Sequence, residues 1–315
     1  MSDIRAVIQE KLPLTVSEMI DVAKQFGARV TDVVLIETEL RTGLSREEIL
    51  TGIMNEYAHN LKAVEIGVKD GENVMGKIVA ALRRMGFDEI YDTALGADLT
   101  VIEETEEFLA RLEENRDLPL LTSCCPGWVQ YCEKKHPEFL KNVSTCRSPM
   151  QMMASILKDQ SAKSSRKMFH VAIMPCTGKK FEAAREEFAQ DGIPNVDAVL
   201  TTQEFIRMLK ESGIMFSELE PEAIDMPFGM VSGAGVIFGV TGGVTEAVLR
   251  RVVSNKSRSE LLSIANAGQR GTDGLKEFEV PYGDRALRIA VVSGLRHAEE
   301  VLARVAAGEH FDFIE

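Results

Sequence analysis

Residues 118–135 read LPLLTSCCPGWVQYCEKK, and this stretch decides the expected fold. A short apolar run at 118–123 is typical of a buried strand, and Trp128 to Lys135 is typical of a helix. Between them, Cys124 and Cys125 stand directly before Pro126, so two thiols fall in the loop that joins strand to helix. The stretch therefore predicts a strand–loop–helix unit with reactive side chains in its loop.

The same order of strand, loop and helix recurs along the rest of the chain. Buried strands are expected at 168–174, 198–201 and 287–292, each followed by a helix. Thr201 and Glu204 have the spacing of a capping box at the start of one of these helices. Repeated units of this kind predict an α/β fold, with a parallel sheet covered by helices on both faces. Both cysteine loops are then expected beyond the carboxyl ends of strands, where such sheets bind their ligands.

The first 67 residues differ from the rest and are expected to form a separate helical segment. Apolar residues such as Val16, Ile20 and Ala23 recur there at helical spacing, and the segment holds no cysteine. We therefore expect two domains, at 1–67 and 68–315.

Two helix starts are predicted just after this boundary. Asn73 is expected to cap a helix that ends at Gly86, and Asp98 or Thr100 to cap a helix that runs to about Glu114.

Charge and hydropathy narrow the class of protein. The formal net charge of −13 argues against a nucleic-acid partner, because phosphate contacts need clustered Lys and Arg. No apolar run approaches the roughly 20 residues of a membrane helix, and no apolar signal segment follows Met1. We expect a cytoplasmic protein that does not enter a membrane.

In that compartment the five cysteines are expected to be thiols rather than disulfides. Cys132 and Cys146 are interpreted as small buried residues. Cys124, Cys125 and Cys176 stand in strand–helix loops, where the positive end of a helix favours the thiolate form that binds metal. A structural zinc site is the alternative, but two loops without a CxxC pair fit it poorly.

These two loops resemble the first two signature motifs of the iron-only (FeFe) hydrogenases. Residues 122–128 match TSCCPxW and residues 174–182 match MPCxxKxxE at every fixed position. Similarity extends to 73–108, 143–152, 198–205, 233–250 and 288–315, so the resemblance covers residues 68–315. It implies the catalytic fold of that family and the reversible conversion of protons and electrons to dihydrogen.

The resemblance also implies a cofactor, the H-cluster, in which a 4Fe-4S cluster is joined to a two-iron subsite. By position, Cys125 and Cys176 match iron ligands, and Cys124 matches a thiol that passes protons to the subsite. The other residues that match the cofactor's surroundings are Ser123, Met174, Pro175, Lys179, Gly235 and Phe238.

A proton path is implied through Glu182, Ser144 and Glu107, with Arg111 at its outer end. Glu107 and Arg111 are four residues apart on one helix face, and their spacing alone is typical of a solvated surface ion pair. The implied partners are protons and dihydrogen, an electron donor such as a ferredoxin or an electron-transfer subunit, and maturation proteins.

Three departures from the family pattern stand out, one of which is Met150, at a position where many relatives carry glutamine. The third motif, MACxxGCxxGGG, would begin directly after Glu315, so the expected H-cluster domain lacks two of its four cubane cysteines. No APxxR-like strand precedes Asn73. Residues 16–67 are instead loosely similar to the N-terminal helices of bacterial L-serine dehydratases.

Three functions are therefore open at this stage. The first is a hydrogenase domain that is active when the missing cysteines are supplied. The second is a non-catalytic iron–sulfur or cluster-carrier protein, although a carrier has no use for Cys124 or Glu182. The third is an apo-protein that acts through residues 1–67 as an interaction module.

Overall fold

The computed structural model describes most of the chain beyond residue 72. The described residues are 6–7, 9–11, 21–22, 24–25, 67, 73–164, 167–228, 231–253, 264 and 274–315. Most of the helices predicted for residues 1–67 lie outside this set. The chain divides into two compact units, one of residues 1–75 with 209–219 and one of residues 76–208 with 220–315. Every feature below belongs to the second unit unless stated.

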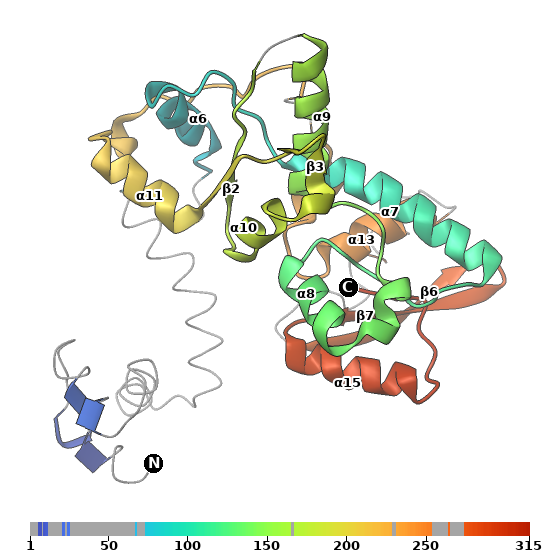
Figure 1. Cartoon of the computed structure of the whole chain (residues 1–315). Coiled ribbons are helices and arrows are strands. Elements are labelled where there is room, and N and C mark those ends of the chain that lie inside the picture. Colours follow the sequence, from blue (N-terminus) through green and yellow to red (C-terminus); the bar gives the residue numbers. More distant parts are fainter. Residues whose placement is uncertain are drawn as a thin grey trace. The chain divides into compact units, whose positions relative to one another are not determined.

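One sheet of four strands has the order β1-β8-β7-β6, and Figure 1 labels its strands β6 and β7. Its strands are β1 (Leu120–Leu121), β8 (Phe313–Ile314), β7 (Arg285–Val292) and β6 (Leu275–Tyr282). β8 runs parallel to both β1 and β7, as the strand–helix repeats predict. β6 was not predicted, and it pairs with β7 in antiparallel register as a hairpin.

The position of β8 determines whether residues 311–314 are buried or exposed. Apolar residues at 311–314 could have formed an open sheet edge prone to association. Instead β8 lies inside the sheet, and Phe311, Phe313 and Ile314 are buried. Residues 313–314 are therefore not at a sheet edge, because β8 has a partner strand on each side.

Helices cover both faces of this sheet, as predicted. On one face, Leu120, Ile289 and Phe313 pack against α7 (Ala94–Glu114) and α13 (Gly243–Val252). On the other face, the next residue of each strand packs against α15 (Leu295–Ala306) and Cys132 of α8 (Pro126–Lys135). Side chains alternate between the faces of a strand, so an unbroken apolar run such as Leu120–Leu121 belongs in a sheet buried on both sides.

A second, parallel pair is formed by β2 (Val171–Met174) and β5 (Ala198–Thr201). Met150 and Ala154 of α9 (Pro149–Lys163) pack against this pair. Two-residue strands β3 (Ala189–Gln190) and β4 (Ile193–Pro194) form a hairpin nearby in sequence. The predicted single parallel sheet is therefore divided into separate sheets, and the two cysteine loops leave different ones.

The remaining elements are short. They are α6 (Met75–Arg84), η2 (Pro137–Asn142), α10 (Gly178–Ala183), η3 (Glu186–Phe188), α11 (Thr202–Glu211), η4 (Phe216–Glu218) and α12 (Gly233–Ile237). α11 runs from the second unit into the first, which also contains η4.

Local capping signals were mostly correct. Asn73 accepts the amide of Met75 at the start of α6, and Gly86 follows α6 with a φ of +94°. Thr201 and Glu204 exchange hydrogen bonds as a capping box. The start of α7 was wrong, because the helix begins at Ala94, whose amide donates to Asp92. Asp98 and Thr100 lie inside α7.

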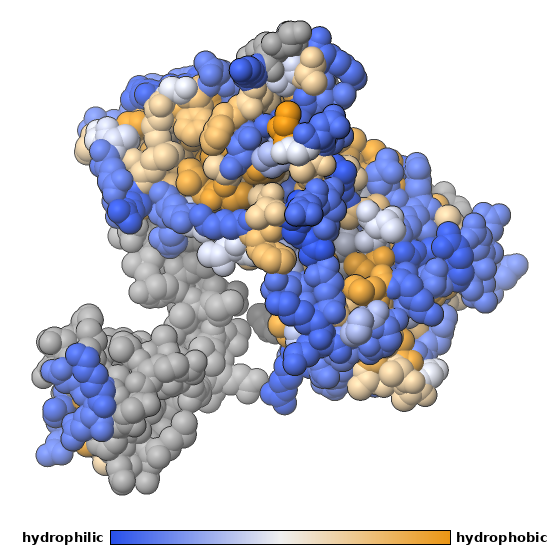
Figure 2. Space-filling view, in the orientation of Figure 1, coloured by the Kyte–Doolittle hydropathy of each residue, from blue (hydrophilic) through white to orange (hydrophobic). Residues whose placement is uncertain are grey.

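The outer face of α7 carries the charge that the composition implies. Glu103, Glu106, Glu113 and Glu114 are exposed there, and this part of the surface is hydrophilic in Figure 2. Among the described residues, none of the helices is long and apolar enough to cross a membrane.

Candidate functional site

The first cysteine loop gives its two thiols different surroundings. Cys125 has an extended backbone and stands at the N-cap of α8, with Pro126 in the first turn, where its missing amide costs nothing. The thiol of Cys125 is exposed, whereas Cys124 is half-buried against the apolar cluster beneath the sheet. The loop is closed from outside by Trp128, whose indole N–H donates to the carbonyl of Thr122 at 3.0 Å.

The second cysteine loop follows β2. Met174 is buried at the end of the strand, while Pro175 and Cys176 are exposed. The amide of Gly178, the first residue of α10, donates to the Cys176 sulfur at 3.2 Å. An accepted hydrogen bond of this kind stabilises a sulfur that carries negative charge.

The two loops meet although they leave different sheets. A Cβ added to Gly178 would lie 3.2 Å from Cγ of Pro126 and 3.3 Å from the sulfur of Cys176. Lys179 reaches across and donates to the carbonyl of Cys124 at 2.9 Å. The glycine therefore permits a close approach that places both cysteine-bearing helix starts side by side.

Three ionisable residues of α7 share the face that points into the protein. Glu104, Glu107 and Arg111 are three and four residues apart, the spacing of one helix face. Arg111 is only 4% exposed, so the interpretation of Glu107 and Arg111 as a solvated surface pair is wrong. Its guanidinium donates to Glu107 at 2.6 Å and to the carbonyls of Asp117, Asn142 and Val143.

Glu107 connects this helix to the 144–146 loop. Ser144 donates its hydroxyl to Glu107 at 2.8 Å, and the amide of Thr145 donates to the same carboxylate at 3.0 Å. The thiol of Cys146 lies 3.6 Å from Glu107 and is half-buried, so Cys146 is not the buried apolar residue that was expected. Burial raises the pKa of Cys146 to about 12. The grouping of Glu107, Arg111 and Ser144 is as the resemblance implied.

Glu104 is the site residue that the sequence analysis missed. It is 1% exposed, and its Oε2 atom has no hydrogen-bond partner among the described residues. Burial raises its pKa to about 8, helped by the charges of Glu107 and Glu315, against a hydrogen bond with Ser144 and the charge of Arg111. The signal was present in the sequence: Glu104 occupies the apolar stripe of α7 between Val101 and Phe108.

Cys124, which is half-buried, interacts electrostatically with Glu104 and Glu315. Burial raises the pKa of its thiol well above the usual range, and the carboxyls of Glu104 and Glu315 raise it further. Glu315 accepts the amides of Gly242 and Thr245 at 3.2 and 2.7 Å, at the start of α13. Desolvation raises its pKa against those hydrogen bonds. Loop, helix and strand thus bring three acidic groups together in a site with little water.

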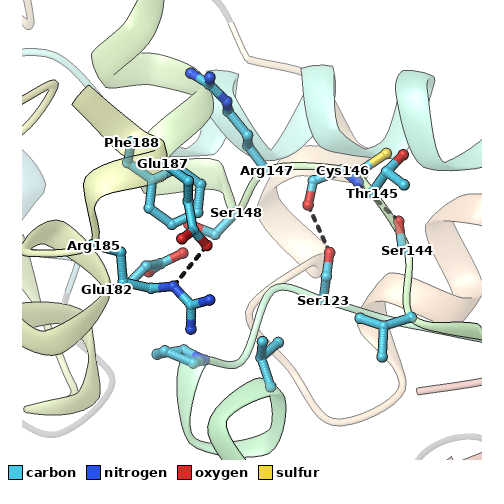
Figure 3. A pocket seen from close by; sticks show the side chains of 13 residues that line it. Ser123, Ser144, Thr145, Cys146, Arg147, Ser148, Glu182, Arg185, Glu187 and Phe188 are labelled. Carbon is cyan, nitrogen blue, oxygen red and sulfur yellow. Dashed lines mark hydrogen bonds and ion pairs between the residues drawn. The ribbon is translucent and has the colours of Figure 1, made fainter. Parts of the chain in front are cut away.

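Glu182 lies apart from the Glu107 group. Its carboxylate is buried and accepts a hydrogen bond from the Lys179 ammonium at 2.7 Å. Among the described residues, no hydrogen bond joins Glu182 to Ser144. Both residues line one cavity of about 330 Å³, which Figure 3 shows with Ser123 and Cys146 on one side and Glu182 and Arg185 on the other. Ser123 closes that side by donating to the carbonyl of Cys146 at 2.6 Å. The implied path from Glu182 to Ser144 therefore runs across a cavity rather than through a hydrogen bond.

Phe238 and Gly235 are positioned by α12. Phe238 ends that helix and packs against the main apolar cluster. Gly235 is buried, and a Cβ at this position would lie 2.3 Å from the carbonyl oxygen of Ala94, so only glycine fits there. Asp98 accepts the amides of Ser232 and Gly235 at 2.6 and 2.8 Å, so it holds the start of α12 rather than capping its own helix.

The donor set fits an iron–sulfur cluster in part. Such clusters are held by cysteine thiolates, typically four. The exposed thiols of Cys125 and Cys176, on touching helix starts, can hold one side of a cluster. Across the described ranges, no group of three or more His, Cys, Asp or Glu side chains is placed to hold a metal ion. These residues by themselves thus account for two ligands.

Comparison with known proteins identifies what this site resembles. Residues 53–315 match the family defined by the C-terminal domain of the large subunit of iron-only hydrogenases. The apo form of the FeFe-hydrogenase HydA1 from Chlamydomonas reinhardtii has a TM-score of 0.66 and 34% identity, over 82% of this chain and 74% of that one. The mixed α/β architecture is therefore that of the FeFe-hydrogenase catalytic fold, as expected.

Curated relatives fall into two functional groups. The NADP-reducing hydrogenase subunit HndD of Solidesulfovibrio fructosivorans is 44% identical over 261 residues, which are 80% of this chain and 45% of that protein. Iron hydrogenase 1 of Clostridium pasteurianum is 43% identical over 71% of this chain and 40% of its own length. Cytosolic iron-sulfur assembly component 3 of Rattus norvegicus is 33% identical over 76% of this chain and 53% of its own. The chain spans about half the length of the curated relatives it matches.

Proposed function

The chain belongs to the iron-only hydrogenase family, as a C-terminal domain of the large-subunit type, and from that membership we propose that it serves the reversible reduction of protons to dihydrogen. The observation that carries the proposal is the meeting of two kinds of residue at one place. Exposed thiols suited to iron stand on touching helix starts, and a buried row of proton-carrying groups leads away from them.

In this proposal Cys125 and Cys176 bind the cubane part of an H-cluster, and further thiolates complete its ligation. When bound, the cluster supplies electrons and the metal at which hydrogen reacts. Lys179 is held by Glu182 and by the carbonyl of Cys124, so a cation faces the site from a fixed position. A fixed cation stabilises negative charge on a bound group in a site that excludes water.

The proton-carrying role rests on residues of this chain alone. We propose that protons pass between Cys124 and solvent by way of Glu104, Ser144 and Glu107. Glu104, with a pKa of about 8, changes protonation near neutral pH, which is the property of an efficient proton donor and acceptor. Arg111 fixes Glu107 so that its carboxylate stays within hydrogen-bond distance of Ser144. In this proposal Glu104 is added to the proton path that the resemblance implied. Glu182 instead fixes the position of Lys179 through their ion pair.

A second candidate function has its own support. The similarity to cytosolic iron-sulfur assembly component 3 favours a non-catalytic protein that carries or transfers clusters. Such a protein needs the two exposed thiols but gains nothing from burying Glu104 beside Cys124. Burial of a carboxyl with one oxygen left without a hydrogen bond is costly, so the presence of Glu104 favours the hydrogenase proposal.

The setting and partners follow from the same proposal. Free cysteines without a disulfide among the described residues agree with a reducing cytosol. The proposed partners are a ferredoxin or another electron-transfer protein and the maturation proteins that build the two-iron subsite.

The test is made on protein expressed with hydrogenase maturation proteins and purified without oxygen. Iron, acid-labile sulfide and the electron paramagnetic resonance spectrum would be measured, followed by hydrogen evolution from reduced methyl viologen. We expect Cys125→Ser and Cys176→Ser each to lower the iron content, and the matched control Cys146→Ser to leave it unchanged. Iron that is bound equally well by all four proteins would contradict the assigned ligands. A stable cluster with no hydrogen evolution would favour the carrier function.

A further inference from the structure

α8 and α10 are short helices that begin at the two cysteine loops (Figure 1). Each cysteine stands just before its helix, and its carbonyl accepts a hydrogen bond from an amide of the first turn, from Val129 for Cys125 and from Lys179 for Cys176. Because each thiol moves with its own helix start, the separation of the two sulfurs depends on how the helices are held together. At the cysteine end they touch through Gly178 and Pro126. A single contact of this kind leaves two short helices free to hinge about it.

A second contact lies at the opposite end of the two helices. Arg185 follows α10, and both of its terminal nitrogens donate to the carboxylate of Glu133 near the end of α8, one of them at 3.1 Å. The third nitrogen of the Arg185 guanidinium, Nε, donates to Glu187 at 2.7 Å, and the guanidinium lies over the ring of Phe181. Bidentate pairing of a planar guanidinium fixes both distance and orientation.

This pair differs from the usual surface salt bridge. The side chains of Arg185 and Glu133 are 20% and 31% exposed, so both are partly removed from water. Arg185 stands in the wall of the cavity that also contains Ser123 and Glu182 (Figure 3). The hydrogen bond from Lys179 to the carbonyl of Cys124 adds a third tie, at the cysteine end, between α10 and the loop that precedes α8.

We propose that Glu133 and Arg185 are positioning residues that lock α8 to α10, so that the Cys125 and Cys176 thiols stand at a fixed separation before any metal arrives. The purpose of the lock rests on the function proposed above, but the lock itself does not. A pre-arranged thiol pair binds a cluster with a smaller loss of conformational freedom than two independent loops.

The first arm of the test uses the metal-free chain. Cys124, Cys132 and Cys146 are replaced by alanine, which leaves Cys125 and Cys176 as the reactive thiols. A short, rigid bismaleimide then reports how often the two sulfurs lie within its span, measured as the cross-linked fraction by intact mass. We expect Arg185→Gln to lower the cross-linked fraction about threefold, because the effective concentration of one thiol near the other falls.

Two further variants make the result specific. The exchanged pair, with Glu133→Arg and Arg185→Glu together, can form the same contact in reverse and is expected to recover the wild-type fraction. Arg304→Gln, which breaks an ion pair on the sheet instead, is the matched control and is expected to leave the fraction unchanged. An unchanged fraction in Arg185→Gln, an equal fall in Arg304→Gln, or no recovery in the exchanged pair overturns the proposal. Circular dichroism on each variant identifies any that has unfolded.

The second arm measures cluster retention in the chain with all its cysteines. After reconstitution, a chelator is added and the loss of iron–sulfur absorbance is followed; we expect about tenfold faster loss in Arg185→Gln and an unchanged rate in Arg304→Gln. Equal rates in wild type and Arg185→Gln would count against a positioning role. A wild-type chain that never takes up iron contradicts the proposed function, and the cross-linking result then decides the lock independently.

Discussion

Two groups of glutamates in this protein have opposite ionisation behaviour. Near the cysteine loops, Glu104 and Glu315 are desolvated, and burial raises the pKa of both, that of Glu104 to about 8. In the sheet cluster around Phe311, Glu277 of β6 and Glu309 of the loop after α15 accept hydrogen bonds from Arg304 and Arg288, which lower the pKa of both, that of Glu309 to about 2. The residue type is the same, and the surroundings reverse its behaviour.

The difference lies in what replaces water around each carboxyl. Arg288 and Arg304 stack on the ring of Phe311 with centroid distances of 4.4 and 5.4 Å, which holds both guanidiniums ready for the two carboxylates. No arginine or lysine among the described residues donates a hydrogen bond to Glu104, and its Oε2 atom has no hydrogen-bond partner there. The sheet cluster therefore keeps its charge and contributes to stability, while the buried group keeps a proton at a cost in stability. A proton carrier needs the second arrangement.

The largest expected effect is on the pH dependence of the free energy of unfolding, when the buried acid Glu104 is replaced by glutamine. A raised folded-state pKa means that stability is fully present below the ordinary pKa near 4.5 and is lost as pH rises through about 8. Wild type should therefore lose about 4 kcal/mol relative to Glu104→Gln between pH 4 and pH 9. Urea unfolding of both proteins across this pH range measures the difference. A difference that does not vary with pH would show that Glu104 is not the buried acid described here.

An intermediate case is the pair of Lys179 and Glu182, which is buried yet paired. Its side chains are 13% and 6% exposed, so Lys179→Gln leaves a buried carboxylate without its cation. We expect a loss of about 3 kcal/mol in the free energy of unfolding. The control is Lys163→Gln, which breaks an exposed pair with Asp159 and should cost at most about 0.5 kcal/mol. Equal losses in the two variants would mean that burial does not decide the value of these pairs.

The smallest effect is expected in the sheet cluster. Arg304→Gln should lower Tm by about 2 °C at pH 7, because two partly exposed ion pairs, with Glu277 and Glu309, and one cation–π contact are lost. The lowered pKa of Glu309 means that its contribution is present above about pH 4.5 and is lost as pH falls towards 2. Calorimetry at pH 7 and pH 2.5 should therefore show the Tm difference shrinking in acid. A difference that grows in acid would contradict the assigned charge state.

Features decided within a few residues were predicted correctly. The capping box of Thr201 and Glu204, the strand at 198–201 and the loop that carries Cys124 and Cys125 all depend on neighbouring residues in the chain. Asp98 shows where this reasoning stops. Its residue type favours a helix cap, and its carboxylate does accept a hydrogen bond at the start of a helix. That helix is α12, and the donor is the amide of Ser232, 134 residues further along the chain.

The antiparallel strand β6 and the interior position of β8 were also beyond local patterns. The apolar alternation of Leu275–Tyr282 is weak, and its pairing with β7 is a hairpin added to an otherwise parallel sheet. No local pattern shows that Phe313 and Ile314 lie inside a sheet, because their partner strand β1 lies almost 200 residues earlier in the chain.

The sequence by itself determined the strand–loop–helix units, the two cysteine loops and the family to which they belong. Each of these is written in adjacent residues, through apolar runs, turn residues and fixed motif positions. Only the tertiary structure decided that Arg111 is buried, that burial raises the pKa of Glu104 to about 8 and that Arg185 forms a bidentate ion pair with Glu133. Desolvation and pairing depend on segments that meet from far apart in the chain, so no local pattern contains them.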